Sequence, residues 1–167
     1  MQPLHAAIKN EHVQIALTLL EIDGINVNTF DSAGDTPLIS AMENELLSVA
    51  ERLIAAGADV QVNSKSLACS SLIHHVASRG NVGLLKMLSK APGFDSQMFK
   101  LPAGPLHFTP LHLASRGGKD DMCRFLLPLS DVSAMDKNGK TPAQLAEKNR
   151  KLSTAELIQD WCASSLQ

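Results

Sequence analysis

One short motif recurs five times along this chain at nearly constant intervals. It reads Gln2-Pro3-Leu4-His5-Ala6-Ala7 where it first appears and Thr109-Pro110-Leu111-His112-Leu113-Ala114 in its fullest form. The other copies start at Thr36, Ser71 and Thr141, so the successive intervals are 34, 35, 38 and 32 residues. Such a period is typical of proteins built from repeated supersecondary units, in which neighbouring units stack to bury one continuous apolar core.

Each copy of the motif carries the signals that begin a helix. A Thr or Ser side chain can cap the first turn, and a Pro in the next position loses nothing, because the first helical N–H has no intrahelical partner. Thr36, Thr109 and Thr141 are each followed by Pro. Further along each repeat, apolar residues recur at helical spacing, as in 47–54. Each repeat is therefore predicted to contain two short helices that need their neighbours for stability.

This motif and its period resemble the ankyrin repeat. The turn sequences Asp31-Ser-Ala-Gly34 and Asp136-Lys-Asn-Gly139, in which Gly can supply a positive φ, precede two of the motifs. The segment Gly57-Ala-Asp-Val60 is similar to the family's exit from the second helix. The resemblance covers nearly the whole chain.

The resemblance implies an all-α ankyrin-repeat solenoid of about five stacked helix-turn-helix repeats with short hairpin-like connecting loops. We expect a single domain over residues 1–167, with repeats at approximately 1–30, 31–63, 64–98, 99–135 and 136–162. The last repeat is more polar than the others and is predicted to be a C-terminal cap. The first begins directly at its first helix, so we expect either a truncated repeat or a native protein that dispenses with the first turn.

Composition excludes several functional classes. The 167 residues have a formal net charge of −2, 4% aromatic residues and no Tyr, which argues against a nucleic-acid interface. No apolar stretch is long enough to cross a bilayer, so we expect no direct membrane insertion. The three Cys residues lie too far apart for a disulfide framework or a zinc site. We expect a cytoplasmic protein with no cofactor and no metal.

The small net charge conceals a change of sign along the chain. Residues 1–63 carry nine acidic and two basic residues, whereas residues 64–151 carry thirteen basic and six acidic ones. Ankyrin proteins usually meet partners with their hairpin tips and the exposed ends of their first helices, so the resemblance implies a protein–protein interaction module. By motif position, the expected partner-binding residues are Glu43, Asn44, Lys65, Arg79, Lys100, Phe108, Arg116, Lys137, Asn138, Lys140 and Lys148. We expect repeats three to five to accept an acidic or phosphorylated segment, with Arg79 and Arg116 as forked donors.

Three alternatives stand beside this expectation. The charges could be solvated side chains whose pairs contribute only about 0–1 kcal/mol each. The chain could be a regulatory or targeting ankyrin segment of a larger enzyme, channel or microbial effector. Direct catalysis is disfavoured, because no Cys–His or Ser–His–Asp arrangement stands out, and we expect neither an enzyme nor a small-molecule substrate. His5, His74 and His112 share one motif position and are predicted to be structural.

Two connections depart from the family pattern. The 63–70 segment lacks the usual Asp and Gly and contains Cys69, which is expected to be the most exposed thiol. The 95–108 segment is longer than standard and holds apolar residues among helix-breaking Pro and Gly. It is predicted either to fold back over the third repeat or to present an apolar patch to a partner.

Overall fold

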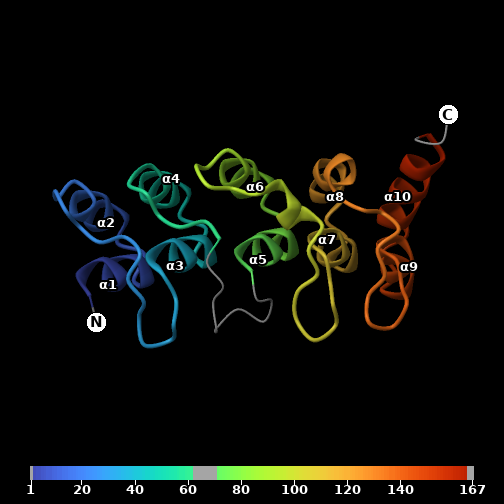
Figure 1. Ribbon diagram of the computed structural model, residues 1–167, viewed down its shortest axis with the longest axis horizontal. Helices are drawn as coiled ribbons and strands as arrows, with labels where there is room; N and C mark the ends of the chain where they lie inside the picture. The colour runs from blue at the N-terminus through green and yellow to red at the C-terminus, as the bar shows by residue number, and fades with distance from the viewer. Residues whose placement is uncertain (1, 62–70, 165–167) are drawn as a thin grey trace. The chain divides into compact units, whose positions relative to one another are not determined.

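The computed structural model describes residues 2–61 and 71–164, and these form ten α-helices, two 3-10 turns and no β-strand (Figure 1). This content confirms the predicted all-α class. The chain divides into two compact units, Met1–Leu72 with Met87–Phe94, and Ile73–Lys86 with Asp95–Gln167. The single domain over residues 1–167 stays a prediction.

The first unit is built on two helix pairs, α1 (Pro3–Lys9) with α2 (Val13–Leu19) and α3 (Pro37–Glu43) with α4 (Leu47–Ala55). Helix α1 packs on α2 and α3, α3 packs on α4, and α2 packs on α4. The side chains between them, including Ile8, Leu38 and Leu53, are fully buried. Burial of this seam stabilises helices of seven to nine residues that would be marginal alone.

The second unit repeats this arrangement. It contains α5 (Leu72–Arg79) from Ile73 onward, the first part of α6 (Val82–Ser89), η1 (Ser96–Phe99), α7 (Pro110–Gly117), α8 (Asp120–Leu126), η2 (Leu127–Leu129), α9 (Pro142–Lys148) and α10 (Leu152–Ser164). Helix α7 packs on α8 and α9, and α10 packs on α9 and α8. Leu111, Met122, Leu126 and Ile158 lie in this core.

The predicted helix caps are present. The hydroxyls of Thr36, Thr109 and Thr141 each accept a hydrogen bond from the N–H three residues ahead. In the last two repeats the third residue returns a bond to the capping N–H, through His112 Nδ1 at 3.3 Å and Gln144 Oε1 at 3.0 Å. Each pair of bonds satisfies two backbone donors that a helix start otherwise leaves unpaired, which fixes where α7 and α9 begin.

The link from first to second helix requires one residue with a left-handed backbone. Gly80 and Gly118 fill this position with φ values of 82° and 68°, and Glu11, Glu45 and Arg150 fill it in the other repeats. A β-carbon on Gly118 would lie 2.8 Å from Lys151 Cδ, so a side chain there would force Lys151 to move. The Gly117-Gly118 pair thus forms the turn between α7 and α8.

The long 95–108 segment folds back onto the second unit. Phe99 packs edge-on against Phe125 with ring centroids 6.4 Å apart, and Phe108 stacks on His112 at 5.9 Å. An isolated bridge between Ala103 and Phe108 closes the bend. Phe99 and Phe108 are buried, whereas Leu101 and Leu106 stay exposed. Both rings pack on residues of the fourth repeat, so a cover over the third repeat stays a prediction.

The packed seam predicts where truncation of a leucine destabilises the first unit. Leu38 has no exposed surface, and Leu47 is 43% exposed. We expect Leu38→Ala to lower the free energy of unfolding by about 2–5 kcal/mol, because it leaves a cavity, and Leu47→Ala to lower it by less than about 1 kcal/mol. Urea unfolding followed by circular dichroism measures both. Equal losses for the two variants would contradict the packing described.

Candidate functional site

One aspartate organises the hairpin tip at 31–35, and another organises the tip at 136–140. In the first unit, Asp31 Oδ1 accepts hydrogen bonds from the N–H groups of Ala33 at 2.8 Å and Asp35 at 3.0 Å. In the second unit, Asp136 Oδ1 accepts from Asn138 at 2.7 Å and Lys140 at 2.9 Å. These bonds hold the tip backbone in a fixed turn, because each carboxylate oxygen accepts hydrogen bonds from two backbone N–H groups of the same turn.

The motif histidines tie the first helices to the next connection. His5 Nε2 lies 3.1 Å from the Asp35 carbonyl oxygen, His74 Nε2 lies 3.0 Å from that of Leu101, and His112 Nε2 lies 3.0 Å from that of Lys140. Because His112 Nδ1 accepts from the Thr109 N–H, its proton resides on Nε2, which donates to Lys140. Burial lowers the pKa of both His74 and His112, although the neighbouring carbonyls oppose this effect. The predicted structural role of these histidines is confirmed.

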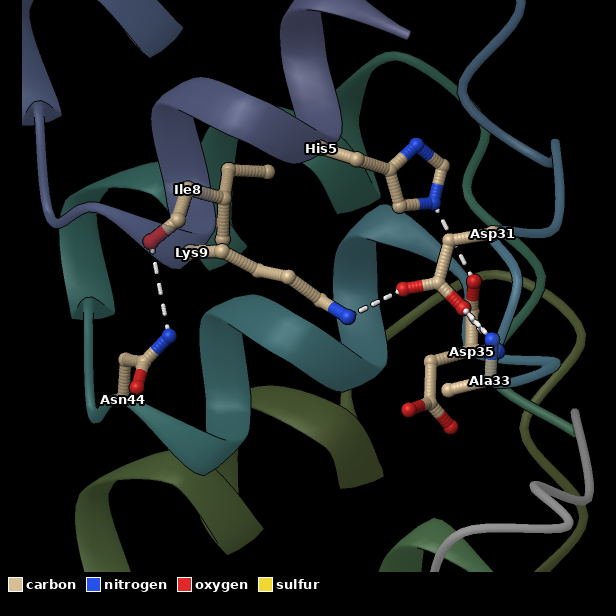
Figure 2. Close-up of polar contacts among 7 residues, drawn as sticks. All are labelled: His5, Ile8, Lys9, Asp31, Ala33, Asp35 and Asn44. Atoms are coloured by element: carbon tan, nitrogen blue, oxygen red, sulfur yellow. Dashed lines mark hydrogen bonds and ion pairs between the residues drawn. The ribbon is translucent and has the colours of Figure 1, made fainter. Parts of the chain in front are cut away.

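An ion pair joins the end of α1 to the first hairpin. Figure 2 shows Lys9 Nζ reaching Asp31 Oδ2, on the side of the carboxylate that faces away from the turn. In the same view the Asn44 side chain, at the end of α3, donates to the Ile8 carbonyl at 3.4 Å. Sequence reasoning missed the pair between Lys9 and Asp31, although the opposite charges at a helix end and at the first hairpin residue were a signal for it. The cation at the end of α1 is therefore already neutralised.

This arrangement sets the ionisation of Asp31. Partial burial alone would raise the pKa of the Asp31 carboxyl, but the Lys9 ammonium and the N–H groups of Asp35 and Ala33 outweigh it and lower that pKa to about 2. The depressed pKa stabilises the fold above the ordinary value of 3.8, and this contribution is lost as the pH falls toward about 2.

We accordingly expect the free energy of unfolding to fall less steeply in Asp31→Asn than in the native chain as the pH drops from about 4 to about 2. The Asn retains the Oδ1 acceptor of the turn but does not titrate. Urea unfolding across this pH range measures the slope. In parallel, Lys9→Met should raise the Asp31 pKa, measured by NMR of the side-chain carboxyl. An unchanged Asp31 pKa in Lys9→Met would contradict the role given to the ion pair.

The first-helix ends of the second unit are basic and uncompensated. Arg79, Arg116 and Lys148 are exposed at the ends of α5, α7 and α9. Within residues 73–86 and 95–164, no ion pair joins any of the three to a carboxylate. The hairpin adds Lys137 and Asn138, both exposed, and its Lys137 N–H donates to the Leu106 carbonyl at 3.0 Å. That bond brings the 103–108 bend against the hairpin.

The structure distributes the other predicted contact residues unevenly. Lys100 is exposed after η1, and Lys140 is half-buried in the hairpin. Phe108 is only 7% exposed and offers little surface to a partner: its ring packs on His112 and carries the Arg116 guanidinium, whose Cζ lies 5.6 Å from the ring centroid. Glu43 and Asn44 are half-buried in the first unit. Lys65 and Cys69 lie outside the described residues.

The structure also bears on metal binding, membrane insertion and thiol chemistry. Among the described residues, no group of three or more His, Cys, Asp or Glu side chains is placed to hold a metal ion. In the same ranges, no helix is both long and apolar enough to cross a bilayer. Burial raises the pKa of Cys123 to about 11, so this thiol stays protonated at neutral pH and is a poor nucleophile.

Comparisons with known proteins agree with this architecture. A family model described as ankyrin repeats (3 copies) matches residues 1–64 and 71–163. The Drosophila melanogaster transient receptor potential cation channel subfamily A member 1 is 24% identical over 164 residues, which cover 93% of this chain and 14% of the channel. Human Rabankyrin-5 is 30% identical over 156 residues, covering 86% of this chain and 13% of the relative. The mouse B-cell lymphoma 3 protein homolog is 34% identical over 94 residues, covering 56% and 20%. The chain thus spans a fifth or less of the length of these three relatives.

Proposed function

The chain belongs to the ankyrin repeat family, and from that premise we propose that its second unit binds an acidic or phosphorylated segment of a protein partner. Ankyrin repeats are in general protein–protein interaction modules. We define the basic tip surface as the exposed or half-exposed residues Arg79, Lys100, Arg116, Lys137, Asn138, Lys140 and Lys148. Glu43 and Asn44 stay proposed contacts in the first unit.

The observation that carries this proposal is the absence of carboxylate partners for Arg79, Arg116 and Lys148 in the described part of the second unit. At the position of the first repeat that corresponds to Arg116 and Lys148, Lys9 is neutralised by Asp31. A helix dipole stabilises cations in a last helical turn by about 0.3–1 kcal/mol, which gives the helix-end residues a structural role as well. That effect does not account for Lys137 and Lys140, because both lie in the hairpin.

The geometry suits an oxyanion. Arg116 rests on the Phe108 ring, and a guanidinium held by an aromatic face keeps its remaining N–H groups directed outward in a planar fork. Such a fork matches the two oxygens of a carboxylate or a phosphate, and hydrogen bonds of this charged kind contribute about 1.5–3 kcal/mol each. The fixed hairpin bonds of Asp136 reduce the ordering that binding must impose.

A peptide array tests the proposal. The array carries Asp/Glu-rich segments in unphosphorylated and phosphoserine forms, and bound peptides are titrated by fluorescence anisotropy. We expect Arg79→Glu with Arg116→Glu to weaken binding by about tenfold or more, and binding by the native chain to weaken as salt is raised.

The matched control is Arg52→Glu with Lys90→Glu, which makes the same charge change at exposed residues of the first unit. It should retain nearly native affinity. If the tip variant binds as tightly as the control, or if no acidic or phosphorylated peptide binds the native chain above a neutral peptide, the proposal is wrong.

A second proposal is that the chain is a regulatory or targeting segment of a larger enzyme, channel or microbial effector. Its support is the short share of the relatives that the chain covers, 14% of one that is named as a cation channel. Sequencing of full-length transcripts tests it. A further domain in the same reading frame supports the proposal, and a transcript that encodes these residues alone contradicts it.

A further inference from the structure

A groove runs along α10 in the second unit, apart from the residues of the basic tip surface. Its volume is about 700 Å³. One wall comes from α8 and the residue after it, through Asp120, Arg124 and Leu127. The other wall is one side of α10, contributed by Ser153, Glu156, Leu157, Asp160, Trp161 and Ser164. Helix α10 has 13 residues, whereas the other helices have seven to nine, so the groove extends along more than three turns.

Hydrogen bonds between α8 and α10 fix the position of the two walls before a ligand binds. Ser153 Oγ donates to Asp120 Oδ2 at 3.1 Å, and the buried Thr154 hydroxyl donates to Asp120 Oδ1. Asp120 is the first residue of α8. Its function in the structure is to fasten the start of α8 to the start of α10. A wall fixed in this way needs little ordering when a ligand binds.

The groove joins an apolar floor to unpaired negative charge. Leu127 is buried, Leu157 is half-buried, and Trp161 is 37% exposed. Glu156 and Asp160 are exposed and lie four residues apart on α10, a spacing at which like charges repel. Helix α10 contains no Lys or Arg, and no ion pair joins either carboxylate to a cation in residues 71–164. Arg124, the one cation of the lining, comes from the opposite wall.

We propose that this groove binds a basic segment of a partner protein in which a Lys or Arg lies next to an apolar side chain. The cation lies between the Trp161 ring and the carboxylates of Glu156 and Asp160, because indole is the best aromatic face for a cation and neither carboxylate has an ion pair within residues 71–164. The apolar side chain lies on Leu127 and Leu157. This charge preference is the opposite of that of the basic tip surface, so the two surfaces recognise different segments.

The chain offers a direct spectroscopic signal for this site. Trp161 is its single Trp, and it has no Tyr, so its long-wavelength emission reports on the groove alone. A random heptapeptide display library is selected on the native chain and, in parallel, on Glu156→Gln with Asp160→Asn. Peptides enriched on the native chain are synthesised and titrated against Trp161 emission.

We expect the native chain to enrich peptides with Lys or Arg beside Leu, Ile or Phe, and these peptides to shift Trp161 emission in a saturable way. Glu156→Gln with Asp160→Asn should weaken their binding by tenfold or more while leaving helical content unchanged, because both side chains are exposed. The control, Glu21→Gln with Glu51→Gln, removes two exposed charges from the first unit and should bind as the native chain does.

Two outcomes overturn the proposal. The first is the absence of basic–apolar enrichment on the native chain relative to the groove variant. The second is binding that leaves Trp161 emission unchanged or that the groove variant retains, including association of the chain with itself. The variant Arg79→Glu with Arg116→Glu separates this proposal from the previous one, because it should weaken the binding of acidic peptides at the basic tip surface and leave binding in the groove intact.

Discussion

Burial of one apolar seam between neighbouring helices is the constraint on which this structure depends. Most of its helices have seven to nine residues, a length at which an isolated helix in water is largely unfolded. In each unit the first helices pack on one another and on their second helices, so residues such as Leu38 and Leu111 lose all contact with water. The repeats are thus stable only as neighbours, and each leaves its hairpin and first-helix end available for other molecules.

A small set of hydrogen bonds attaches the hairpins to the packed helices and keeps them rigid. A buried motif histidine bonds to a backbone carbonyl of the following connection, and an aspartate inside the turn accepts from two of its N–H groups. The two described hairpins use the same bonds in different units, His5 with Asp31 and His112 with Asp136. Because the tips are ordered before any partner arrives, their charges can act at fixed positions.

Local signals made much of this predictable, and distant contacts account for the rest. The helix starts at Thr109 and Thr141 could be predicted from the sequence, because a helix cap involves residues only three positions apart. The burial of Phe108 could not be predicted in the same way, since Phe108 and the exposed Leu106 are equally apolar and only the fold-back of the bend decides which one faces inward. The groove along α10 was missed for a similar reason, because it depends on Asp120 bonding to residues more than thirty positions away.

Phe108 gives Arg116 surroundings that differ from those of Lys9 at the equivalent place in the first unit. Lys9 and Arg116 hold the same position in their first helices, six residues after the motif proline. Lys9 forms an ion pair with Asp31 and is neutralised there. The Arg116 guanidinium instead rests on the Phe108 ring. Asp136 Oδ2 corresponds to the oxygen that Lys9 contacts, and it is buried without a hydrogen bond. An aromatic face attracts a cation without cancelling its charge. Phe108, the residue directly before the motif Thr109, therefore holds the Arg116 guanidinium at the surface without neutralising it, where an anionic partner can reach it.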